Sequence, residues 1–97
     1  KSLVDCQLGY VGIVRWPIGT FMKPHFDSNN VHTPNKVAAM LYLNNDFEGG
    51  NLIFEDRVVK PEPGKLIIFE NTKNLHYVDK VEDSERYALS FWYYSVE

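Results

Sequence analysis

A histidine and an aspartate, His25 and Asp27, stand two positions apart in the segment KPHFDSNN at residues 23–30. If this segment is a β-strand, residues two apart point to the same side, so both side chains could reach one ion. An imidazole nitrogen and a carboxylate oxygen together suit a divalent metal of intermediate hardness. A His-x-Asp pair is common by chance, and a capping or surface pair is the simpler interpretation of these two residues alone.

A metal site needs a third ligand, and the chain has two other histidines, His32 and His76. His32 lies in the polar stretch SNNVHTPNK, which we interpret as a surface loop that leaves His32 solvated. We predict that residues 28–35 form a lid over the site. His76 opens a predicted strand, where its side chain could join the first pair. Two histidines and one carboxylate on one face of a metal leave three positions open, as in non-haem Fe(II) oxygenases.

An arginine, Arg86, opens the last predicted strand, RYALSFWYY. It shares one face of that strand with Ala88, Ser90 and Trp92. If this face lies inside the protein, Arg86 needs an anion, because a buried unpaired charge costs several kcal/mol. A dicarboxylate co-substrate would pair with the planar guanidinium, and Ser90 and Tyr42 would add hydrogen bonds. If the face is solvated, Arg86 is an ordinary surface charge, and the pattern alone does not decide.

Eight short strands separated by clusters of turn residues are predicted along the chain. Their ranges are 10–16, 20–26, 36–44, 51–55, 57–60, 65–69, 76–82 and 85–95. Only residues 1–9 are compatible with the end of a helix. We therefore expect an all-β sandwich or jelly roll closed around a small interior. The strand at 36–44 is apolar on both faces and should be central, and Phe26 should point away from the metal and pack between the sheets.

The composition is that of one domain, with 97 residues, 44% of them hydrophobic, and a net charge of −3. The scattered basic residues and the acidic balance argue against nucleic-acid binding. A single cysteine excludes an internal disulfide, and no apolar run approaches the ~20 residues that cross a membrane. We expect a cytoplasmic monomer without a membrane partner, and, because the chain begins at Lys1, an N-terminal supporting region that is truncated or minimal.

Three segments together resemble the catalytic core of the prolyl-hydroxylase-like 2-oxoglutarate- and Fe(II)-dependent dioxygenases. They are RWPIGTFMKPHFD, MLYLNNDFEGGNLIF and PEPGKLIIFENTKNLHYVDKVEDSERYALSFWY, and the resemblance covers roughly residues 10–95. It implies a double-stranded β-helix, a cupin-like jelly roll with little or no helix. It also implies Fe(II), 2-oxoglutarate and O₂, with ascorbate as a candidate reductant. The implied reaction hydroxylates a C–H bond, with a prolyl residue of a peptide or protein as the leading substrate, in the manner of a prolyl 4-hydroxylase, and with succinate and CO₂ as co-products.

The resemblance also assigns roles to individual residues. The iron-binding and catalytic residues it implies are His25, Asp27 and His76. The co-substrate residues it implies are Arg86, which would pair with the distal carboxylate of 2-oxoglutarate, and its neighbours Tyr42, Ser90 and Trp92.

Met22 and Trp16 depart from the family pattern, because some relatives carry tyrosine at these positions near the co-substrate or substrate. Nucleic-acid dealkylases typically carry two arginines on the last strand, whereas position 92 is Trp here, which favours the hydroxylase branch. Three alternatives stay open. They are a hydroxylase of a free amino acid or other small molecule, a cupin-like metal protein without oxygenase activity, and a structural β-sandwich with a coincidental His-x-Asp.

Overall fold

The structure is a computed structural model that describes residues 6–26, 35–70 and 73–95. Asp27, His32 and residues 28–34 of the predicted lid lie outside this part of the chain. Strands account for all the regular structure within it, so it holds no helix that could span a membrane. The strands are β1 (Cys6–Trp16), β2 (Met22–His25), β3 (Asn35–Tyr42), β4 (Leu52–Phe54), β5 (Val58–Val59), β6 (Leu66–Phe69), β7 (His76–Val78) and β8 (Arg86–Ser95).

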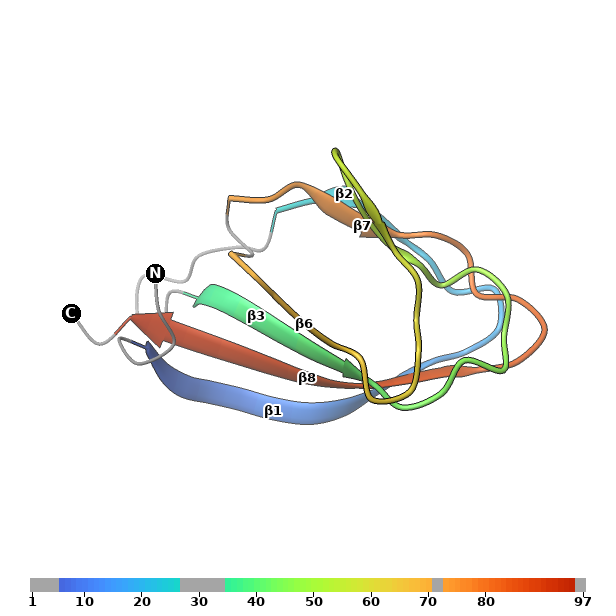
Figure 1. The fold of residues 1–97 in the computed structure, drawn as a ribbon, viewed down its shortest axis with the longest axis horizontal. Coiled ribbons are helices and arrows are strands. Elements are labelled where there is room, and N and C mark those ends of the chain that lie inside the picture. Colours follow the sequence, from blue (N-terminus) through green and yellow to red (C-terminus); the bar gives the residue numbers. More distant parts are fainter. Residues whose placement is uncertain (1–5, 27–34, 71–72, 96–97) are drawn as a thin grey trace.

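The strands form two antiparallel sheets that face each other as two layers (Figure 1). One sheet has the strand order β1-β8-β3-β6 and the other has the order β2-β7-β4-β5. Each sheet draws strands from both halves of the chain, so consecutive strands repeatedly cross from one layer to the other. This is the double-stranded β-helix, and the predicted fold class is confirmed.

Every predicted strand range overlaps one observed strand, but the expected helix end in residues 1–9 is wrong for the residues described. Residues 6–9 belong to β1, because β8 is long enough to pair with them. Cys6 is opposite Ser95 and Leu8 is opposite Tyr93 in that ladder. The pairing partner of this segment lies almost 90 residues away in sequence, so local patterns gave no sign of it.

The prediction for 36–44 is confirmed, because β3 lies between β8 and β6. Its residues Val37, Ala38 and Ala39 are all buried. The prediction for Phe26 is wrong, since this side chain is 52% exposed. The strand β2 ends at His25. Phe26 therefore lies outside the strand, and its side chain does not pack between the sheets.

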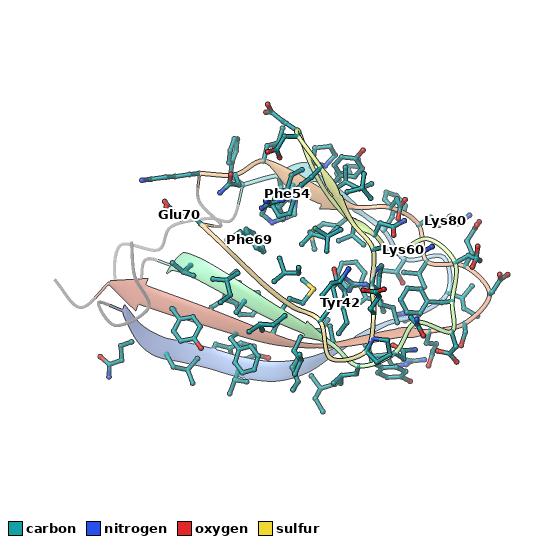
Figure 2. The ribbon with its side chains drawn as sticks, viewed as in Figure 1. Tyr42, Phe54, Lys60, Phe69, Glu70 and Lys80 are labelled. Carbon is teal, nitrogen blue, oxygen red and sulfur yellow. The ribbon has the colours of Figure 1, made fainter. Side chains whose placement is uncertain are left out.

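The core fills the space between the inner faces of the two sheets. Figure 2 shows Phe54 and Phe69 facing one another from the two layers, with Tyr42 further along β3. The two phenylalanine rings meet edge to face, with their centroids 5.1 Å apart. Two small buried residues, Ala38 and Ala88, lie opposite the large rings of Trp92 and Tyr42 in the ladder between β3 and β8.

Candidate active site

His25 and His76 lie opposite each other on the neighbouring strands β2 and β7, where they are register partners. Their ring centroids are 4.4 Å apart. The fold therefore brings together two of the three predicted metal ligands, while the third, Asp27, lies outside the described residues. Within residues 6–26, 35–70 and 73–95, no group of three His, Cys, Asp or Glu side chains gathers in a way that could hold a metal.

Each of the two histidines is oriented by a backbone carbonyl two residues before it. The Nδ1 atom of His25 lies 2.7 Å from the oxygen of Lys23, and Nδ1 of His76 lies 2.7 Å from the oxygen of Asn74. A carbonyl oxygen only accepts, so Nδ1 carries the proton and donates in both rings. The ring lone pair is then on Nε2 in both histidines, which is the tautomer that such outer contacts fix in metal-binding histidines.

Two phenylalanines surround the second histidine. The centroid of the His76 ring lies 4.9 Å from that of Phe69 and 6.1 Å from that of Phe54. His76 is only 4% exposed. Phe69 ends β6 and Phe54 ends β4, so the two sheets each contribute one ring to a dry, fixed environment for this imidazole.

Arg86 is fully buried, with no exposed surface, so the inward interpretation of its strand face is confirmed. Its Nε donates a hydrogen bond of 2.9 Å to the carbonyl oxygen of Gly50, and its Nη2 lies 3.4 Å from Sδ of Met40. The guanidinium carbon lies 4.8 Å from the centroid of the Trp16 ring and 5.1 Å from that of Tyr42. These contacts hold the cation between two aromatic faces, a favourable arrangement for a desolvated guanidinium.

Gly50 approaches the arginine so closely that a side chain would not fit. A Cβ at this position would lie 2.9 Å from Cδ of Arg86 and 2.9 Å from a ring carbon of Phe47. The backbone of Gly50 also has φ of +63°, a region that favours glycine. The second glycine of the EGG segment therefore both accepts from Arg86 and makes room for it.

Two buried donors of this cluster have no hydrogen-bond partner among the described residues. They are Nη1 of Arg86 and the hydroxyl of Tyr42. Burial lowers the pKa of Arg86 and raises the pKa of Tyr42, although the charge of Arg86 opposes the rise. An orphaned buried polar group costs free energy, so two beside each other indicate an acceptor that binds there.

A cavity of about 130 Å³ lies between the sheets, beside the histidine pair. Both histidines line it, together with Ser90 and Trp92, two of the residues expected near the co-substrate. Arg86 and Tyr42 lie behind its wall. The residues of the wall that contact the guanidinium are Trp16 and Met40.

Residues 11–94 match the family model of the 2OG-Fe(II) oxygenase superfamily. The chain belongs to this superfamily. The match includes part or all of each of the eight strands and every predicted site residue, including Asp27. Family membership favours the oxygenase interpretation over a metal protein without oxygenase activity and over a plain structural sandwich.

Known oxygenases of this superfamily that resemble the chain include prolyl hydroxylases. Prolyl 3-hydroxylase 2 of Rattus norvegicus is 34% identical over 70 residues, which are 64% of this chain and 10% of that protein. The chain thus spans about a tenth of the length of the curated relatives it matches. The structure of a Pseudomonas putida prolyl-4-hydroxylase is 28% identical, with a TM-score of 0.76 over 88% of this chain and 51% of its own.

A third similar oxygenase is a prolyl hydroxylase from Trichoplax adhaerens, solved in complex with a hypoxia inducible factor oxygen degradation domain peptide fragment. It is 26% identical, with a TM-score of 0.72 over 96% of this chain and 48% of its own.

Sequence reasoning missed the residues that hold this oxygenase site in place. Gly50, Met40 and the two phenylalanines beside His76 were not predicted to have a role. One signal was available in the sequence, because Met40 lies two residues before Tyr42 and so shares its strand face. The pairing of Trp16 with Arg86 became visible only in the structure. The two family departures, Met22 and Trp16, both line the cavity.

Proposed function

We propose that the protein is a 2-oxoglutarate- and Fe(II)-dependent dioxygenase that hydroxylates prolyl residues of a peptide or protein. One observation carries the proposal. Two buried donors, Nη1 of Arg86 and the hydroxyl of Tyr42, lie together without a partner among the described residues. Two donors and one positive charge fit a carboxylate, which only accepts. The distal carboxylate of 2-oxoglutarate would satisfy both.

The histidine pair fits the iron of such an enzyme. His25 and His76 would bind it through Nε2, since Nδ1 of each ring lies against a backbone oxygen, and Asp27 would follow as the carboxylate ligand. This set leaves positions on the metal for a chelating co-substrate and O₂. Bound Fe(II) and 2-oxoglutarate would supply the oxidising chemistry, in which O₂ adds one oxygen atom to the substrate C–H bond and one to succinate as CO₂ leaves.

The chain's own residues supply placement and exclusion of water. Arg86 and Tyr42 would fix the far end of the co-substrate, with Ser90 as a further donor on the cavity wall. Phe54 and Phe69 pack against the ring of His76, and this apolar packing would help to exclude water near the metal. Each of these side chains comes from a strand, so the site is built on rigid elements of the fold.

The substrate class is supported by the names of the similar proteins. The curated relative and the two solved structures described above are all prolyl hydroxylases, and one was solved with a peptide. A prolyl ring in a peptide would approach the cavity past Trp92, which is partly buried in its wall. The ring carbon that is hydroxylated distinguishes the 3-hydroxylase and 4-hydroxylase outcomes.

The test is succinate formation with Fe(II), 2-oxoglutarate and a panel of proline-containing peptides, with and without ascorbate. Each peptide has a control in which alanine replaces proline, and the His76→Ala protein serves as the enzyme control. We expect succinate and hydroxyproline in equal amounts only with proline peptides and the unmodified protein. Succinate that forms equally with the alanine peptides, and without hydroxyproline, would contradict the proposed substrate.

A further inference from the structure

Met40 contacts the buried arginine and also lines the cavity. Its Sδ lies 3.4 Å from Nη2 of Arg86, and its side chain forms part of the cavity wall. It lies two residues before Tyr42 on β3, so the two side chains share the inner face of the sheet. Met40 therefore separates the cavity from the two unpartnered donors.

The contact of the Met40 sulfur with Arg86 can be replaced by a contact with a stronger acceptor. A thioether is a weak acceptor, whereas a carboxylate oxygen binds a guanidinium strongly. A methionine side chain is unbranched, with three rotatable bonds, so it moves aside more easily than a branched or aromatic side chain. A carboxylate that reaches Arg86 from the cavity would replace the sulfur on Nη2, and the Met40 side chain would then pack beside the bound acid.

The other boundaries of the arginine pocket are fixed. The carbonyl oxygen of Gly50 accepts from Nε at 2.9 Å, and Arg86 packs so closely on Gly50 that a Cβ there would lie 2.9 Å from Cδ. Trp16 stacks on the guanidinium with a rigid indole that is only 9% exposed. The space available for the chain of a dicarboxylate can therefore change mainly at Met40.

We infer that Met40 determines which 2-oxo dicarboxylate the site accepts, an inference that rests on the proposed function. The side chain at this position sets the space between the metal end of the cavity and the guanidinium. A residue that fills the same space should keep the preference for one chain length. A residue that leaves the space empty should admit an acid that is longer by one methylene.

The test measures binding of oxaloacetate, 2-oxoglutarate and 2-oxoadipate, which differ stepwise by one methylene. Calorimetric titration with Mn(II) in place of iron gives affinities without turnover. The variants are Met40→Ala, Met40→Leu and the control Ile67→Ala. Ile67 is the register partner of Met40 on β6 and is partly buried, but it does not line the cavity.

We expect the unmodified protein to prefer 2-oxoglutarate, and Met40→Ala to reduce its preference over 2-oxoadipate by roughly tenfold or more, the usual effect of one methylene in an apolar pocket. Met40→Leu conserves volume and should keep the preference within about threefold. Ile67→Ala should leave it unchanged. Met40→Val is a smaller truncation that serves the same test if the alanine variant does not fold.

Two results overturn the inference, and they are distinguishable. If the unmodified protein binds 2-oxoglutarate while Met40→Ala keeps its preference, or Ile67→Ala shifts it equally, Met40 does not set chain length and the proposed function stands. If the unmodified protein binds none of the three acids with Mn(II), the proposed function fails together with the inference.

Discussion

The guanidinium of Arg86 lies 5.1 Å from the ring centroid of Tyr42, and each residue holds one buried donor without a partner among the described residues. The other nitrogens of the arginine are occupied by Gly50 and Met40. These contacts fix the orientation of Arg86. Its remaining donor, Nη1, belongs to a guanidinium that lies beside the phenol ring of Tyr42. Two neighbouring donors beside a positive charge fit an anion.

Replacing Arg86 should weaken 2-oxoglutarate binding without lowering the free energy of unfolding. A buried guanidinium without an anion is costly, so Arg86→Met, which fills similar space without charge, should keep or raise the free energy of unfolding. The same change removes hydrogen bonds to a charged partner and should weaken 2-oxoglutarate binding at least about 100-fold. Thermal melting and calorimetric titration measure the two effects. Equal binding by Arg86→Met and the unmodified protein would show that the co-substrate binds elsewhere.

Removing the phenol should have two opposite effects. In Tyr42→Phe the buried unpartnered hydroxyl is gone, which should stabilise the protein by about 1 kcal/mol, while 2-oxoglutarate binding should weaken about tenfold. Chemical denaturation and titration give these values. A variant that is less stable by a similar amount would mean that the hydroxyl has a partner within the folded chain.

The close approach of Gly50 to Arg86 predicts a large cost for any side chain there. Gly64 is a matched control, because its φ of +84° is also positive but a Cβ there would meet nothing within 4 Å. We expect Gly50→Ala to cost about 1–3 kcal/mol more than Gly64→Ala, since it adds overpacking to the backbone strain that both share. Equal losses in denaturant melts would remove Gly50 from its assigned role.

A surface cluster gives a pH dependence with a defined sign. Arg15 on β1 and Tyr87 on β8 both donate hydrogen bonds to Glu85, and these bonds lower its pKa, with Arg15 as the larger cause. A carboxylate with a lowered pKa stabilises the fold above its ordinary pKa of 4.5, and this contribution is lost as the pH falls below that value.

The comparison of the unmodified protein with Glu85→Gln isolates that contribution. The difference in melting temperature between them should be present at pH 7 and should shrink as the pH is lowered through and below 4.5. Arg15→Gln removes the same pair from the other strand and should show the same trend. A difference that stays constant from pH 7 into the acid range would exclude this pair as its source.

The strands were predictable because alternating and doubly apolar patterns are local properties of the chain. The inward face of β8 was left undecided, since an arginine fits both a solvated face and a buried site. Burial of Arg86 decides it. The pairing of His25 with His76 depends on the register of two strands from opposite halves of the chain, which the sequence pattern alone does not specify.

The predictions that were wrong or missing also concern contacts between segments that are far apart in the sequence. The pairing of residues 6–9 with the end of β8 and the exposure of Phe26 depend on where ladders begin and end. Gly50 was not predicted to have a role, because its contact with Arg86 joins residues that are 36 positions apart in the sequence. The roles of Asp27 and of the lid predicted at residues 28–35 remain predictions.

The central claim is that the histidine pair and the arginine–tyrosine pair together bind iron and 2-oxoglutarate. Anaerobic titration of the protein with Fe(II) and then 2-oxoglutarate tests it most directly by visible absorption. We predict a weak charge-transfer band that appears only when both are present, and that is lost in His76→Ala and requires far more 2-oxoglutarate in Arg86→Met. The absence of any such band in the unmodified protein at saturating Fe(II) and 2-oxoglutarate would contradict the account.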